Sequence, residues 1–64
     1  MKYDAILKDA IIMDVGLPVR GCVFADSKGR FEDGESVSTS RLLEIICNDE
    51  GNFLRTKNTV YKVE

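Results

Sequence analysis

The sequence predicts an all-β fold, a small antiparallel barrel or meander of four to five short strands. Turn-forming groups recur at short intervals, at Gly16–Pro18, Asp26–Gly29, Glu32–Gly34 and Asn48–Asn52. Between them lie short runs rich in valine, isoleucine, phenylalanine and threonine, which are enriched in strands. Regular turn signals between such runs are typical of all-β domains.

Residues 3–15 fit either a strand or a short helix. Apolar residues recur there at the i, i+3, i+4 spacing of a helix, at Tyr3, Ile6, Leu7, Ala10 and Ile11. Gly16 would end such a helix. The segment nevertheless contains several β-formers in succession, Ile11, Ile12, Met13 and Val15. We therefore favour a strand and keep the helix as the alternative.

The later segments favour strands. Val19–Asp26 has good β-propensity, and Gly21 within it marks a bulge or a close backbone contact. In residues 36–47 the apolar side chains change parity, which predicts a bend near Thr39–Ser40. Residues 52–64 hold two strand-like pieces around a polar turn, with one face formed by Thr59, Tyr61 and Val63.

Length and composition restrict the class of protein. With 64 residues the chain forms one small domain, residues 1–64. The formal net charge of −2 argues against a polybasic nucleic-acid binder, whose affinity comes from counterion release. Charged residues interrupt the apolar start, so we expect no signal peptide, no membrane association and a cytoplasmic location, in the host cytoplasm if the gene is phage-encoded. We expect Cys22 and Cys47, which lack CxxC spacing, to be reduced and buried.

The residues of common active sites are missing. The chain has no histidine, which removes the commonest general base and metal ligand. Neither GxxxxGK(S/T) nor GxGxxG occurs, and two scattered cysteines do not make a zinc site. The acidic residues near Asp33–Gly34 do not fit the EF-hand pattern and are better explained as turn chemistry, with Phe31 tucked under the loop. We expect no enzymatic activity, cofactor or metal.

One stretch resembles a group of known proteins. Gly29–Ser40, followed by residues 55–64, resembles a widespread set of short phage, prophage and bacterial proteins. Their pattern is R-F-x-D-G-x-x-(I/V)-x-T-S, then T-x-N-(S/T)-x-Y. The matching residues are Arg30, Phe31, Asp33, Gly34, Val37, Thr39, Ser40, Thr56, Asn58, Thr59 and Tyr61. The resemblance covers about the last two-thirds of the chain, implies a small β domain that is often phage-borne, and is silent on activity.

Within this pattern, Phe31, Val37 and Tyr61 are expected in or at the edge of the core. The small polar set Thr39, Ser40, Thr56 and Asn58 has two interpretations. The side chains could bond two loops together through backbone groups, or they could converge as a polar binding pocket. We favour the first interpretation.

Three functions remain open at this stage. The first is binding of a host protein, with inhibition of a defence protein as a concrete form. The second is binding of nucleic acid or a nucleotide, with a stacking platform at Tyr61 or Phe31 and one face lined by Arg20, Arg30, Arg41, Arg55, Lys57 and Lys62. The third is homo-oligomerisation through unpaired edge strands. The candidate binding residues are Thr39, Ser40, Arg41, Arg55, Thr56, Lys57, Asn58, Tyr61, Arg30 and Phe31.

Overall fold

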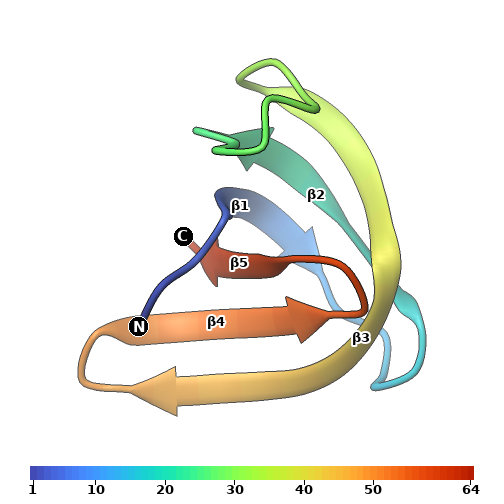
Figure 1. Ribbon diagram of the computed structural model, residues 1–64. Coiled ribbons are helices and arrows are strands. Elements are labelled where there is room, and N and C mark those ends of the chain that lie inside the picture. The colour runs from blue at the N-terminus through green and yellow to red at the C-terminus, as the bar shows by residue number, and fades with distance from the viewer.

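A computed structural model describes residues 1–64, and its five strands close into a barrel (Figure 1). The strands are β1 (Ala5–Ile11), β2 (Pro18–Phe24), β3 (Glu35–Asn48), β4 (Gly51–Thr56) and β5 (Val60–Val63). This confirms the all-β prediction. The N-terminal segment is a strand up to Ile11, and no helix in the structure is long and apolar enough to cross a membrane.

The barrel is an up-and-down ring with one parallel seam. Each strand pairs antiparallel with the next along the chain. Because the number of strands is odd, the first and last run in the same direction, and the ring can close only by parallel pairing of β1 with β5. Ala5 lies opposite Tyr61 and Leu7 opposite Val63 across this seam.

Strand β3 is long and bent, and its two halves serve different neighbours. Its first half pairs with β2 and its second half with β4. Between Ser38 and Arg41 two residues of β3 face a single residue of β2, so a bulge lies at Thr39–Ser40, where the broken parity predicted a bend. A second bulge lies at Leu43.

Gly21 allows the backbones of β1 and β2 to approach closely, one of the two roles predicted for it. A Cβ at this position would lie 2.9 Å from both the Leu7 Cγ and the Lys8 carbonyl oxygen. The bulge itself is in β1, where Asp9 has a φ of 55°. No side chain fits at Gly21 without displacing the neighbouring strand.

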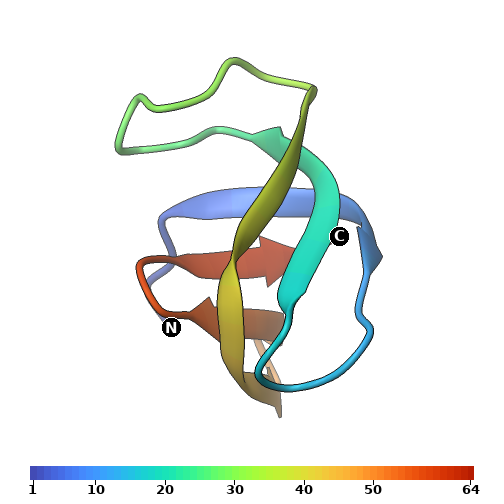
Figure 2. The same ribbon diagram turned by 90° about the vertical axis from the view of Figure 1, so that its right-hand side faces the viewer.

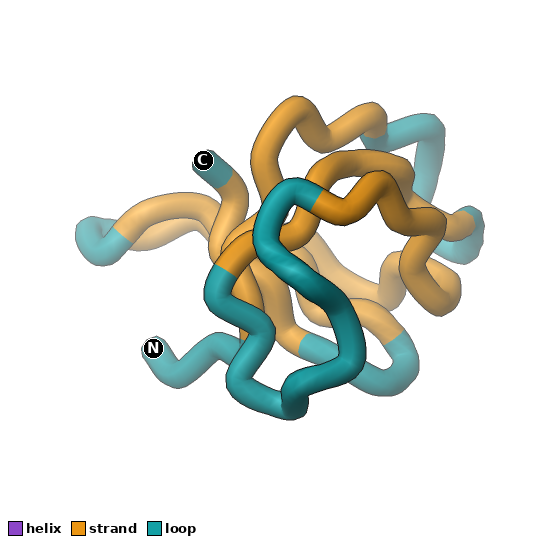
Figure 3. The backbone as a smooth tube through the Cα atoms, turned by 90° about the horizontal axis from the view of Figure 1, so that it is seen from above, coloured by secondary structure: helices purple, strands orange, loops and turns teal.

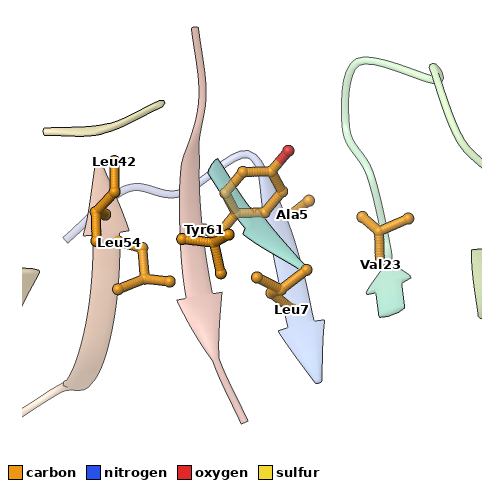
Figure 4. Packing of buried hydrophobic residues seen from close by; sticks show 7 residues of the cluster. Ala5, Leu7, Val23, Leu42, Leu54 and Tyr61 are labelled. Atoms are coloured by element: carbon orange, nitrogen blue, oxygen red, sulfur yellow. The ribbon is translucent and has the colours of Figure 1, made fainter. Parts of the chain in front are cut away.

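The core fills the inside of the barrel (Figure 4). Every strand contributes to it through Ala5, Leu7, Val19, Val23, Leu42, Leu54 and Tyr61. Phe31 and Val37 are half-buried against this cluster, as predicted. Phe53 is buried outside the cluster, where its ring lies 6.0 Å from that of Tyr3. The contact between Phe53 on β4 and Tyr3 thus adds a buried aromatic ring outside the small core.

The loop between β2 and β3 covers one end of the barrel and is nearest the viewer in Figure 3. Its turn is built as predicted at Asp33–Gly34. Gly34 has a φ of 88° and donates its N–H to the Val23 carbonyl, 2.7 Å away. The Asp33 carboxylate accepts the Ala25 N–H at 2.8 Å. This acidic stretch therefore has a structural role in closing the hairpin.

The prediction of two buried cysteines was wrong for one of them. Both thiols are free, but Cys22 is only half-buried and Cys47 is exposed. Cys47 lies near the end of β3, opposite the exposed Asn52. The β3–β4 hairpin has no second layer over this position, so an apolar residue there gains no burial.

Candidate functional site

Two bends that are far apart in the sequence meet beside the middle of β3 (Figure 2). The Lys57 N–H donates to the Arg41 carbonyl at 3.1 Å, and the Asn58 N–H donates to the Ser40 hydroxyl at 3.3 Å. The β4–β5 turn is thus docked on the β3 bulge. The structure brings together six of the ten candidate residues, Thr39, Ser40, Arg41, Thr56, Lys57 and Asn58.

The threonines of this set are structural. Thr56 Oγ1 donates to the Thr59 carbonyl at 2.9 Å and accepts the Thr59 N–H at 3.2 Å, which closes the turn. Thr39 bonds to backbone groups in the same way, and both threonines are buried. This supports the interpretation that the hydroxyls bond two bends together.

The Asn58 side chain was expected to bond to backbone groups of the neighbouring bend, and it does not. Its side chain is exposed and makes no hydrogen bond within the protein. It contributes through its backbone, because the carbonyl accepts the Lys28 ammonium at 2.8 Å. A turn residue with a free side chain is available to a partner, unlike the buried threonines.

Arg30 bonds to Asp26 within the β2–β3 loop and to Thr59 across the barrel, an arrangement that we call the Asp26–Arg30 clasp. Its guanidinium donates to both Asp26 carboxylate oxygens, through Nε at 3.2 Å and Nη2 at 3.1 Å. It also reaches across to the Thr59 hydroxyl at 2.7 Å. The hydrogen bonds from Arg30 lower the pKa of Asp26 to about 2, and Asp26 raises the pKa of Arg30. Arg30 therefore locks the β2–β3 loop to the β4–β5 turn.

Some of the six cations of the predicted basic face interact with other side chains of the protein, and the others do not. Arg55 pairs with Glu44 at 3.0 Å, and the Lys62 ammonium lies 5.7 Å from the centre of the Tyr3 ring. Three other cations, Arg20, Arg41 and Lys57, are exposed and form no salt bridge. Only these three have charges free for a partner among the six proposed.

The predicted stacking platforms are also unavailable. Tyr61 is only 3% exposed and belongs to the core, so it presents no ring face to a base. Phe31 is half-buried, and the Arg30 guanidinium lies 5.3 Å from its ring centre. The assignment of Tyr61 as a platform was wrong because its parity in β5 turns it into the barrel.

An exposed apolar loop is the feature that the sequence analysis missed. We define the apolar loop as Ile11–Leu17, which comprises the last residue of β1 and the connection from β1 to β2. Its large side chains are mostly in solvent, with exposed fractions of 58% for Ile11, 41% for Ile12, 73% for Met13, 55% for Val15 and 49% for Leu17. The signal was present in the run IIMDVGL, but residues 11–15 were interpreted as part of a strand or a helix and only Gly16 and Leu17 as part of a turn.

The apolar loop is fixed to the barrel at one end. The Gly16 N–H donates to the Leu42 carbonyl at 2.6 Å, and the Leu42 N–H donates to the Leu17 carbonyl at 2.9 Å. The Asp14 carboxylate accepts the Val15 N–H at 2.7 Å and shapes the turn. The exposed side chains are therefore presented on an anchored backbone.

The free cations border the apolar loop. Arg20 pairs with Ile11 across β1 and β2, and Arg41 pairs with Pro18 across β2 and β3. The Lys57 N–H donates a hydrogen bond to the Arg41 carbonyl, which places Lys57 beside Arg41. The apolar loop and these three cations are therefore neighbours, and we take them together as the candidate site. It is an open surface, since the structure contains no pocket.

Comparison with protein-family models, curated proteins and solved structures found no match to this chain.

Proposed function

We propose that this protein is a non-enzymatic, phage-type accessory protein that binds a host protein through the apolar loop. The observation that supports this proposal is the exposure of five large apolar side chains on one short loop. Clusters of this kind on a small protein mark interaction surfaces, because leaving them in water is unfavourable.

The anchoring of the loop favours tight binding. A loop whose backbone is held before binding loses less conformational entropy on association. Met13, the most exposed of the five, is a flexible side chain that adapts to an apolar pocket. Arg20 and Arg41 at the rim would favour a partner with acidic groups around that pocket.

The class of partner is proposed by analogy with small phage accessory proteins, because the resemblance itself carries no activity. Small accessory proteins of that kind act by occluding a host protein, and inhibition of a defence protein is the form that we propose. Such an activity requires a surface but no catalytic group. The site of action would be the host cytoplasm.

The test is a comparison of proteins retained from host lysate by three immobilised baits. One bait is the wild type, and the second carries Met13→Asp with Val15→Asp on the apolar loop. The third is a control of equal charge change, Ser36→Asp with Asn52→Asp, at two exposed positions away from the loop. A retained protein is identified, purified and titrated against each bait with and without nuclease treatment.

We expect a purified host protein to bind the wild type and the control, and to lose about tenfold or more in affinity for the loop variant. Equal binding by all three baits would remove the loop from the site. Retention that disappears with nuclease would support the alternative function, nucleic-acid binding through Arg20, Arg41 and Lys57. No retained host protein would contradict the proposal.

A further inference from the structure

The closed ring leaves half of β3 without a neighbour on one side. The C-terminal half of β3 pairs with β4 along one edge, from Leu42 to Asn48. Along the opposite edge, Leu42 is bonded to Gly16 and Leu17, and no strand pairs with residues 43–48. Figure 1 shows this half of β3 as the outer strand of its hairpin. One function predicted from the sequence was self-association through unpaired edge strands. Residues 43–48 of β3 are such an unpaired edge.

This edge lacks lysine and proline, and its only protecting feature is the bulge at Leu43, where it begins. Natural edge strands are blunted by lysine, proline or inward-pointing charges, which prevent pairing with another chain. Residues 43–48 read LEIICN, without lysine or proline. Their one charge, Glu44, is engaged with Arg55 on β4. Ile45 is 47% exposed although its pairing partner Leu54 is buried, so it lies on the core side of the sheet without a cover.

We propose that a second copy of this chain binds this edge, so that the two β3 strands pair antiparallel across a two-fold axis. Backbone groups at alternate residues of the edge would form the ladder, and Ile45 of each copy would be covered by the partner's β3. The pairing would end at Leu43, because Leu17 already occupies the edge at Leu42. The interface shares only Arg41 with the surface proposed for the host protein, and substitutions at Ile45 and at Met13 test the two proposals separately.

Charge complementarity favours a second copy as the occupant. Antiparallel pairing carries the β3–β4 turn of each copy towards the Leu42 end of the other copy's edge. That turn contains Asp49, which is exposed and forms no salt bridge. Arg41 lies at the receiving end and is equally free. The two-fold axis places one such opposite-charge pair at each end of the interface.

The test is sedimentation equilibrium of the purified protein over a wide range of concentrations. We expect a reversible monomer–dimer equilibrium whose Kd rises about tenfold or more in Ile45→Lys. Ile11→Lys is the matched control, because it adds the same charge at an exposed isoleucine on the apolar loop. A dimer lost in Ile11→Lys and retained in Ile45→Lys would overturn the proposal, as would a wild type that is monomeric up to about 1 mM.

Two further measurements report on the geometry of the dimer. Arg41→Glu and Asp49→Arg should each raise the Kd, and the double variant that exchanges the charges should bring it back towards the wild-type value. Amide hydrogen exchange within residues 43–47 should slow as the protein concentration rises. Exchange that slows at none of the amides in this segment on dimerisation would exclude pairing at this edge, whatever the oligomeric state.

Discussion

The Thr39 hydroxyl is the hydrogen-bond partner of the Val19 N–H at the start of β2. Thr39 Oγ1 accepts the buried Val19 N–H at 3.0 Å and donates to the Ser40 carbonyl at 2.7 Å. The β3 bulge removes a ladder partner at this point, and the threonine hydroxyl replaces it.

Thr39→Val should therefore destabilise the protein. The change keeps the shape of the side chain but leaves the Val19 N–H without a partner, at a cost of about 1–3 kcal/mol. Urea unfolding measures the loss. Asn58→Ala is the control, because the exposed Asn58 side chain bonds to nothing, and it should change the unfolding free energy by less than about 0.5 kcal/mol. A larger loss in Asn58→Ala than in Thr39→Val would reverse the roles assigned here.

Gly21→Ala should destabilise by steric overlap. The new methyl group would lie 2.9 Å from the Lys8 carbonyl oxygen, which belongs to the backbone of a paired strand. Separating the strands should cost about 1–3 kcal/mol. Thermal unfolding of this variant beside Ser38→Ala, at an exposed position of β3, measures the effect. Equal melting temperatures would show that the two backbones are further apart.

Gly34→Ala should also destabilise, for a different reason. Its Cβ would meet only the Phe24 ring, at an ordinary 3.9 Å, so crowding contributes nothing. The cost comes from the φ of 88°, which side-chain-bearing residues rarely adopt, and should be about 1 kcal/mol. Gly34→Asn should lose less, because asparagine tolerates positive φ better. An unchanged or raised melting temperature in Gly34→Ala would contradict the turn assignment.

Acid should weaken the Asp26–Arg30 clasp. The pKa of Asp26 is lowered from 3.8 to about 2 by its hydrogen bonds with Arg30, so the folded protein resists protonation that the unfolded chain accepts. The stability from this group is complete above pH 3.8 and is lost as the pH falls towards about 2. Urea unfolding across this range should show a shallower decline for Asp26→Asn than for the wild type. The control Asp9→Asn, at an exposed position whose side chain forms no hydrogen bond or salt bridge, should decline like the wild type, and parallel curves for all three would argue against the clasp.

The two thiols should react at different rates with an aromatic disulfide reagent. In the folded protein at low concentration, exposed Cys47 should react first and half-buried Cys22 more slowly. Because neither is in a disulfide, adding a reductant should leave the melting temperature unchanged. Cys47→Ser should remove the fast phase. A slow phase that disappears instead, or a melting temperature that falls with reductant, would contradict these assignments.

The strands could be predicted because neighbouring residues in the sequence determine where each strand begins and ends. Turn residues such as Asp33–Gly34 specify their own geometry, and the broken parity around Thr39–Ser40 reveals a bulge within one strand. The clasp is only partly local. Asp26 and Arg30 are four residues apart, but the contact of Arg30 with Thr59 spans 29 residues and depends on the closed ring.

The candidate surface could not be predicted in the same way. A run of β-forming apolar residues looks the same whether it lines a core or lies in a loop, and residues 11–15 were therefore assigned to a strand or a helix, with a turn only from Gly16. Likewise, alternation along β5 does not say which side faces inward, so Tyr61 was considered both for the core and for stacking. The pairing of Tyr61 with the buried Ala5 on β1 and the buried Leu54 on β4 decides between these.

The odd number of strands has a consequence for how the protein folds. The seam joins segments from opposite ends of the fold, and its bond from the Val60 N–H to Asp4 spans 56 residues. Every other pairing can grow outwards from a hairpin, whereas this one must wait for a loop as long as most of the molecule to close. We therefore expect the seam to form late and to open first, so that native-state exchange at β5, the shortest strand, reports how often the ring becomes an open sheet.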